Sequence, residues 1–203
     1  MATYGEIVTN VLSIVPTPGR ETLIRNKINQ IIRFIAGVGD FWQALEETTI
    51  GVSEGVDAAS NVQEIPISST ATFRSLLYIK YPESISVIPI EVNHIKNVKS
   101  LQECNKANDV AYVSGSVIRI RNSVLTSEFN LGYYTYPVAF AIDGSDDAET
   151  NWVLESVPGL VEDLTAAYVL NLIGDNEDSK KISDFVAFMQ PSYIRAMVNG
   201  VTE

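Results

Sequence analysis

LIRNKINQIIRF, residues 23–34, is the stretch of this 203-residue sequence that decides its fold. Together with the next residue it places Ile24, Ile28, Ile31 and Ile35 at steps of four, three and four, which form one stripe along a helix. The arginines of this stretch fall mostly outside that stripe. Gly37 and Gly39 follow the stripe and predict its end, because glycine favours the end of a helix.

Helices are also expected before this stretch and at the other end of the chain. Residues 5–15 place apolar side chains on one side of a short helix, and the isoleucine helix is expected to start near Pro18. Pro158 starts another helix, with an apolar stripe every four residues, and Gly174 ends it. That expected stripe consists of Leu160, Leu164, Tyr168 and Leu172.

The last expected helix begins with Asp178 or Ser179 as its cap. Its inner face is expected to comprise Ile182, either Phe185 or Val186, and Met189. Pro191 is expected to break the helix near Gln190, because proline removes a helical hydrogen bond. A short terminal piece, residues 193–198, would follow the break.

The middle of the chain predicts strands separated by turns. Candidate strands are residues 48–52, 62–67, 73–81, 110–113, 116–121 and 129–136. In the third of these, Phe73, Leu77, Ile79 and Tyr81 are expected to share mostly one face. Ser114-Gly115 is the expected hairpin turn, residues 53–60 read as a loop, and residues 94–104 could form a short helix.

The predicted fold class is therefore α+β. Helices from about residues 3–38 and 150–199 would form a bundle, and a central antiparallel β-rich lobe would span about 41–137. The whole chain, 1–203, is treated as one subunit.

Composition favours a soluble globular protein. Hydrophobic residues make up 46% and charged residues 19%, and no apolar run reaches the roughly 20 residues that cross a bilayer. The start of the sequence lacks the features of a secretory signal, and a single cysteine, Cys104, suits a reducing compartment. From Asp143 onward twelve acidic residues face only three basic ones, within a net charge of −11. Such a surface should repel phosphate backbones, although simple solubility explains it as well.

No catalytic, cofactor or metal constellation is recognisable, and we expect the protein not to be an enzyme. His94 is the only histidine, and no zinc or P-loop spacing occurs. Residues 143–147 resemble part of a calcium loop but lack its glycine and terminal glutamate. The adjacent carboxylates Glu46 and Glu47 should not face each other in a strand. The aromatic cluster Tyr133, Tyr134 and Tyr136 could stack on bases but has no basic sequence neighbours, so a sheet face or protein interface is favoured.

Taken in order, these features resemble the head-to-tail adaptor (connector) proteins of tailed bacteriophages, including head-completion and tail tubular proteins. The likeness rests on the isoleucine helix with Phe41-Trp42 after it, residues 65–67 and 73–81, the hairpin at residues 112–115, the Tyr133-Tyr134 strand and the two closing helices. It rests on the order of the pieces and covers most of the chain, without a diagnostic motif.

The resemblance implies a structural virion protein made in the host cytoplasm and placed in the neck of the virion. A homo-oligomeric ring, commonly of twelve copies, would join the portal protein to a tail tube or nozzle protein, and DNA would pass through its lumen without specific binding. No membrane is involved. Alternatives that remain open are another minor tail or tail-terminator component, or a soluble binding module from outside phages.

The end of the chain is the expected portal-binding segment. In related adaptors the C-terminal segment often reaches the portal, and the matching segment here is Tyr193 to Glu203. The expected contact residues are Tyr193, Ile194, Arg195, Met197 and Val198. Tyrosine, arginine and methionine are enriched in interface cores. The alternative is that these residues only close the bundle.

Overall fold

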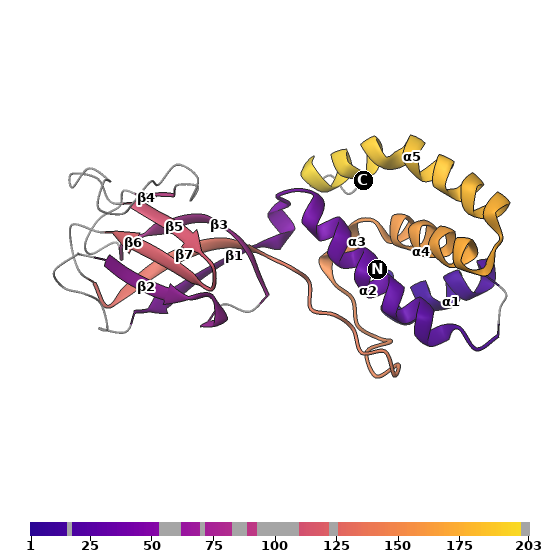
Figure 1. The fold of residues 1–203 in the computed structure, drawn as a ribbon, viewed down its shortest axis with the longest axis horizontal. Coiled ribbons are helices and arrows are strands. Elements are labelled where there is room, and N and C mark those ends of the chain that lie inside the picture. The colour runs from indigo at the N-terminus through magenta and orange to yellow at the C-terminus, as the bar shows by residue number, and fades with distance from the viewer. Residues whose placement is uncertain are drawn as a thin grey trace. The chain divides into compact units, whose positions relative to one another are not determined.

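The structure is a computed structural model that describes residues 1–15, 18–52, 62–69, 72–82, 89–92, 110–121 and 126–199. It belongs to the mixed α+β class, as predicted (Figure 1). The chain divides into two compact units. We call them the helical unit, residues 1–44 with 136–203, and the β unit, residues 45–135.

The helical unit begins with α1 (Tyr4–Ile14) and α2 (Glu21–Val38). A capping box starts α1, where the Thr3 hydroxyl accepts from the Glu6 amide and the Glu6 carboxylate accepts from the Thr3 amide. The expected start of α2 near Pro18 is wrong. Gly19 has φ +78°, in the left-handed region, so the right-handed helix can begin only after it.

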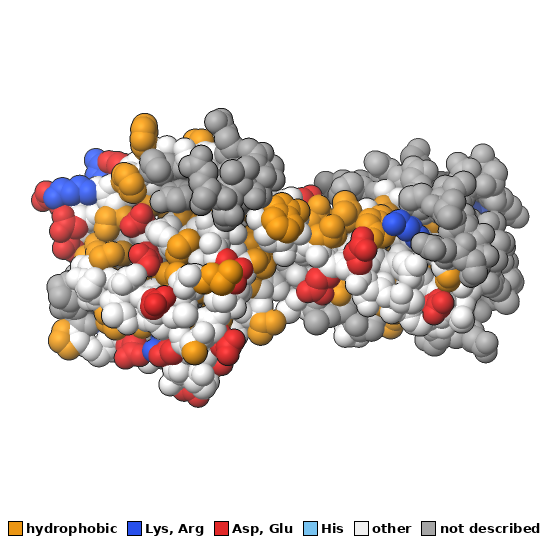
Figure 2. All heavy atoms as spheres, turned by 180° about the vertical axis from the view of Figure 1, so that it is seen from behind, with side chains coloured by type: hydrophobic (Ala, Val, Ile, Leu, Met, Phe, Trp, Pro, Cys, Tyr) orange, Lys and Arg blue, Asp and Glu red, His pale blue; other side chains and the backbone are white. Residues whose placement is uncertain are grey.

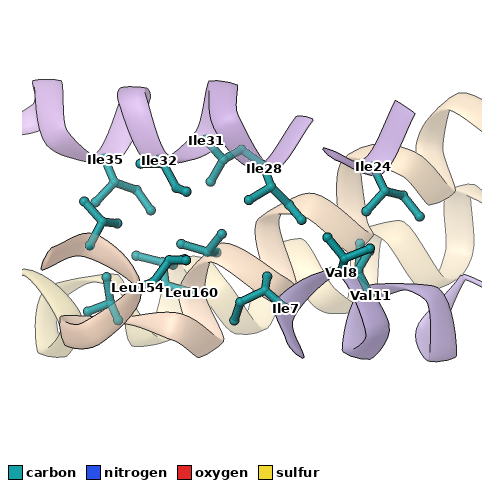
Figure 3. Packing of buried hydrophobic residues seen from close by; sticks show 14 of the residues in the cluster. Ile7, Val8, Val11, Ile24, Ile28, Ile31, Ile32, Ile35, Leu154 and Leu160 are labelled. Carbon is teal, nitrogen blue, oxygen red and sulfur yellow. The ribbon is translucent and has the colours of Figure 1, made fainter. Parts of the chain in front are cut away.

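The isoleucine stripe predicted for α2 is the centre of the helical core. Ile24, Ile28 and Ile35 are at most 3% exposed, and Ile31 is 9% exposed. Figure 3 shows these side chains pointing toward Ile7, Val8 and Val11 of α1, and toward Leu154 and Leu160 near the other end of the sequence. Burying such side chains contributes roughly 1.5–3 kcal/mol each, so this layer holds the two chain ends together.

Two helices from the C-terminal part, α3 (Trp152–Ser156) and α4 (Pro158–Ile173), complete that layer. The expected α4 stripe is wrong in its second half, because Tyr168 is 44% and Leu172 is 52% exposed. The helix is instead buried along a broader surface, including Val161, Thr165 and Val169. It contacts α1, α2, α3 and α5, so no single four-residue stripe can describe its buried side.

The last helix, α5, spans Asn176–Asn199 and differs from its prediction at both ends. It begins earlier than expected, and the Asp175 carboxylate accepts from the Asp178 amide (3.3 Å). It also continues through Pro191, so the expected break near Gln190 is wrong. Proline removes the bond to the carbonyl four residues earlier, which belongs to Ala187. Ala187 is exposed, so water can hydrate that carbonyl and the helix can continue.

The β unit contains β1 (Leu45–Gly51), β2 (Val62–Pro66), β3 (Phe73–Lys80), β4 (Pro89–Val92), β5 (Val110–Ser114), β6 (Val117–Arg121) and β7 (Glu128–Thr135). The strands pair in the order β1-β7-β3-β4-β5-β6-β2. Two antiparallel groups are joined where β4 pairs with β5 in parallel through two residues, Glu91 and Val92. One buried cluster, which includes Ile65, Ile79, Ile118, Phe129 and Leu131, lines the unit.

Two details of the β unit correct the sequence prediction. The hairpin turn consists of Gly115-Ser116, not Ser114-Gly115, because Ser114 pairs with Val117 and Gly115 has φ +61°. On β3 a register shift between Leu76 and Tyr78 changes which side chains face inward. Leu76 therefore packs against the core, and Leu77 is 42% exposed. The expected loop at 53–60 and the possible helix at 94–104 lie outside the described residues.

Candidate interaction surface

The expected portal-binding residues lie in the final turns of α5. The backbone of Tyr193, Ile194, Arg195, Met197 and Val198 is helical and continuous with the rest of α5, rather than a separate terminal piece. Their side chains lie outside the described part of the structure, so their role as a contact site stays a prediction.

Apolar side chains are exposed on the described part of α5. The helix packs on α4 through Ser179, Ile182 and Val186, and the Ser179 hydroxyl donates to the Ala167 carbonyl (2.8 Å). Of the two residues left open by the sequence, Val186 is buried at 6% and Phe185 is 51% exposed. Phe188, three residues further on, is 79% exposed. We call Asp184, Phe185 and Phe188 the α5 patch.

A second pair of exposed apolar side chains lies on α2, next to a positively charged residue. Phe34 is 66% exposed and Val38, one turn later, is 49% exposed. Arg33 precedes Phe34, is exposed, and lies over the ring of Tyr136 with 4.6 Å from guanidinium carbon to ring centroid. We call Arg33, Phe34 and Val38 the α2 patch. The exposed Trp42 follows shortly after α2.

Each patch has one charged residue, Asp184 on α5 and Arg33 on α2, and neither has an oppositely charged partner among the described residues. Asp184 and Arg33 form no ion pair there, whereas Lys181, close to Asp184 on α5, is already occupied. Lys181 contacts Asp178 and Glu177, each at 2.9 Å, and the bonds to Asp178 and then Glu177 raise the pKa of the ammonium. Within the described residues, no opposite charge therefore engages Asp184, and the Tyr136 ring engages Arg33.

The acidic loop after β7 is attached to α2 through hydrogen bonds from Arg25. Arg25 of α2 is only 5% exposed, which corrects its expected place outside the buried stripe. Its Nη1 and Nη2 donate to Asp147 at 2.5 and 3.0 Å, and its Nε donates to Glu21 at 2.9 Å. The hydrogen bond from Arg25 lowers the pKa of Asp147. We call these three residues the Arg25 clasp.

Backbone contacts extend the clasp along the whole loop. The amides of Tyr4 and Gly5 donate to the carbonyls of Glu149 and Asp147, at 2.9 and 3.0 Å. Asn29 of α2 exchanges two hydrogen bonds with the backbone of Phe140. Asp143, the first residue of the run that resembles part of a calcium loop, accepts from the amide and hydroxyl of Ser145, and these bonds lower the pKa of its carboxyl. The loop is thus part of the helical unit.

The carboxylates Glu46 and Glu47 of β1 each accept a hydrogen bond from a tyrosine. Tyr133 donates to Glu46 (3.3 Å), and Tyr78 donates to Glu47. Burial, and then the bond to Glu47, raise the pKa of Tyr78 to about 12. Tyr78 also packs over Gly132, where an added Cβ would lie 2.3 Å from the ring. This arrangement fixes side chains on the sheet, and it does not form a pair of facing carboxylates.

The tyrosine cluster has basic neighbours that the sequence did not predict. Arg74 lies 5.0 Å from the ring centroid of Tyr134, and Arg33 lies 4.6 Å from that of Tyr136. Tyr133 is only 3% exposed and stacks on Phe73. Each of the three rings is therefore engaged by a different neighbour.

The described residues include neither a metal-ligand cluster nor a helix suited to span a membrane. They contain no group of three or more His, Cys, Asp or Glu side chains that could hold a metal ion, and neither His94 nor Cys104 lies among them. None of their helices combines the length and apolarity that crossing a bilayer requires. On the face drawn in Figure 2, acidic side chains are spread between apolar ones, with Lys and Arg at only a few points.

Comparison with protein-family models and with curated proteins finds no match to this sequence.

Proposed function

We propose that this protein is a structural virion component, a head-to-tail adaptor that joins the portal to the tail around the DNA exit channel. The observation that carries the proposal is the way the chain is divided. Helices from both chain ends share one core, and the strands come from the uninterrupted middle of the sequence. In the adaptors that this sequence resembles, a helical bundle packs against the ring and a β-rich lobe faces the tail.

The charge distribution is consistent with a DNA channel. The net charge is −11, and acidic side chains are spread over the face drawn in Figure 2. Like charges repel, so phosphates would pass such a lining without binding to it. In the proposed ring the protein therefore guides DNA and does not hold it.

The expected portal anchor is the end of α5. Residues 193–199 extend a helix that contacts α4 through one side, and the remaining side can face a partner. An amphipathic helix that lies in a groove is a common mode of peptide recognition. In the proposed adaptor, Tyr193 to Glu203 would occupy a groove of the portal.

The test is co-assembly with the portal protein of the same virus. Full-length chain and portal are mixed and analysed by sedimentation and by electron microscopy, and we expect free subunits to be monomeric or weakly associated and to form a ring on the portal. A variant that lacks residues 193–203 should remain folded and fail to join. If the full chain binds the tail tube but not the portal, the adaptor proposal is wrong and a tail-terminator role replaces it.

A further inference from the structure

The helical unit exposes two apolar patches, the α2 patch and the α5 patch, which carry opposite charges. Among the described residues, no ion pair joins the two patches. On α2 an exposed arginine precedes an exposed phenylalanine, Arg33-Phe34, with Val38 one turn later. On α5 an exposed aspartate precedes an exposed phenylalanine, Asp184-Phe185, with Phe188 three residues later. The two patches match in pattern and are opposite in sign.

We infer that the α2 patch of one copy contacts the α5 patch of the next copy, so that this protein associates head to tail. The occupant of each patch is thus a second copy of the same chain. This inference deepens the proposed ring and rests on that proposed function. It assigns the two surfaces that a ring contact requires.

Charge complementarity supports this choice of occupant. Two α5 patches facing each other would bring two Asp184 carboxylates together, and two α2 patches would bring two Arg33 guanidinium groups together. Like charges in a contact are unfavourable, whereas Arg33 against Asp184 gives an ion pair beside stacked apolar side chains. A contact between different surfaces is heterologous, and such contacts close into rings or grow into filaments.

The size of the patches predicts a weak contact. Each patch contributes two large or medium apolar side chains, and a buried aromatic side chain removes about 150–250 Å² from water. Stable interfaces bury about 1,200–2,000 Å² in total. A single contact therefore falls short of a stable dimer, and a closed ring on a template is favoured because each copy then makes two contacts.

Cysteine cross-linking can capture this contact while both patches stay intact. Gly37→Cys and Ala187→Cys are introduced into a Cys104→Ser chain, because both positions are exposed and each lies three residues after a patch member, Phe34 or Asp184. A short bismaleimide is added at high protein concentration. We expect a ladder of trimers and larger species from the double-cysteine chain. Each single-cysteine chain serves as the control and can give at most a dimer.

Charge reversal then tests the pairing itself. In the double-cysteine chain, Asp184→Arg should reduce species above the dimer about fivefold, since the surface ion pair becomes a repulsion. Adding Arg33→Asp should restore them. The inference is overturned if no ladder forms, if Asp184→Arg leaves the ladder unchanged, or if the double reversal does not restore it.

The result separates this inference from the adaptor proposal. A ladder from a chain that never joins the portal supports head-to-tail association and overturns the adaptor role. Portal binding by a chain that gives no ladder supports the adaptor role and overturns the α2–α5 contact.

Discussion

The Arg25 clasp predicts that Asp147→Asn destabilises the helical unit. In the native protein both carboxylate oxygens of Asp147 accept from Arg25. Asparagine has nearly the same shape, and its Oδ1 can still accept from Nη1. Its amide nitrogen, however, would face Nη2, so that two donors oppose each other. The variant thus loses one hydrogen bond and the charge of the carboxylate, while Arg25 stays buried.

The magnitude follows from how far each group is exposed. A hydrogen bond to a charged group contributes about 1.5–3 kcal/mol, and breaking a fully buried pair costs about 3–5 kcal/mol. Two features reduce that cost. The Asp147 side chain is 43% exposed, and Arg25 keeps its contact with Glu21. We therefore expect a loss of about 2 kcal/mol in the free energy of unfolding.

Tryptophan fluorescence during urea unfolding measures this loss selectively. The protein has two tryptophans, Trp42 and Trp152, and both lie in the helical unit. Asp143→Asn is the matched control, because it removes the same charge from the same loop and its side-chain oxygen can still accept from Ser145. The control should leave the urea midpoint close to that of the wild type, because Asp143 is fully exposed to solvent.

The pH dependence supplies a second check. The pKa of Asp147 is lowered by Arg25, so the carboxylate stabilises the folded state above its ordinary pKa, and this stabilisation disappears as the pH falls through the folded pKa. Wild type and Asp147→Asn should therefore converge in acid. Equal unfolding midpoints for Asp147→Asn and Asp143→Asn at neutral pH, or a difference that persists in acid, would refute the role given to the clasp.

Three further predictions concern the two cores and one tyrosine. Ile28→Asp should unfold the helical unit, because a buried unpaired charge costs more than about 5 kcal/mol, as much as the whole stability of a typical protein. The control Asn26→Asp, on the exposed side of α2, should melt like the wild type when followed by circular dichroism, and native melting of Ile28→Asp would contradict the core assignment. Gly132→Ala should destabilise the β unit by about 1–3 kcal/mol by displacing the Tyr78 ring, measured as faster amide hydrogen exchange on β3 and β7, and unchanged exchange would argue against this packing. The pKa of Tyr78 should lie near 12, so the contribution of Tyr78 to stability is complete below pH 10 and lost as the pH rises through 12. Ultraviolet titration compares the wild type with Tyr78→Phe, and the prediction is contradicted if the variant lacks a tyrosine that ionises near pH 10 in the wild type.

Periodicity predicted those elements in which one side of a helix or strand meets one neighbour. The stripe of α2 was correct because α2 presents a single side to the core, and the hairpin of β5 and β6 was correct to within one turn residue. The stripe of α4 was wrong because that helix has neighbours on several sides. The break predicted at Pro191 was wrong, and Ala187, whose carbonyl has no amide partner at residue 191, is an exposed residue of α5.

Contacts between distant parts of the sequence could not be predicted. Arg25 and Asp147 are 122 residues apart, and nothing in the local pattern of either residue names the other. The isoleucine stripe even placed Arg25 outside the core, since a charged side chain is rarely buried without a partner. The neighbours of the tyrosine cluster were missed for the same reason, because Arg33 and Arg74 are close to it only in the folded chain.

The exposed phenylalanines of α5 show where stability of the single chain stops explaining the sequence. Ser179, Ile182 and Val186 fix which side of α5 contacts α4, and the helical repeat then directs Phe185 and Phe188 outward. Burying a phenylalanine in place of a valine would remove more apolar surface from water and stabilise the fold further. The arrangement instead leaves the larger side chains exposed beside Asp184, opposite in charge to the Arg33-Phe34 pair on α2. Groups of large exposed apolar side chains mark interaction sites, and charges belong to the polar rim of such sites. We therefore assign these residues to the contact between copies.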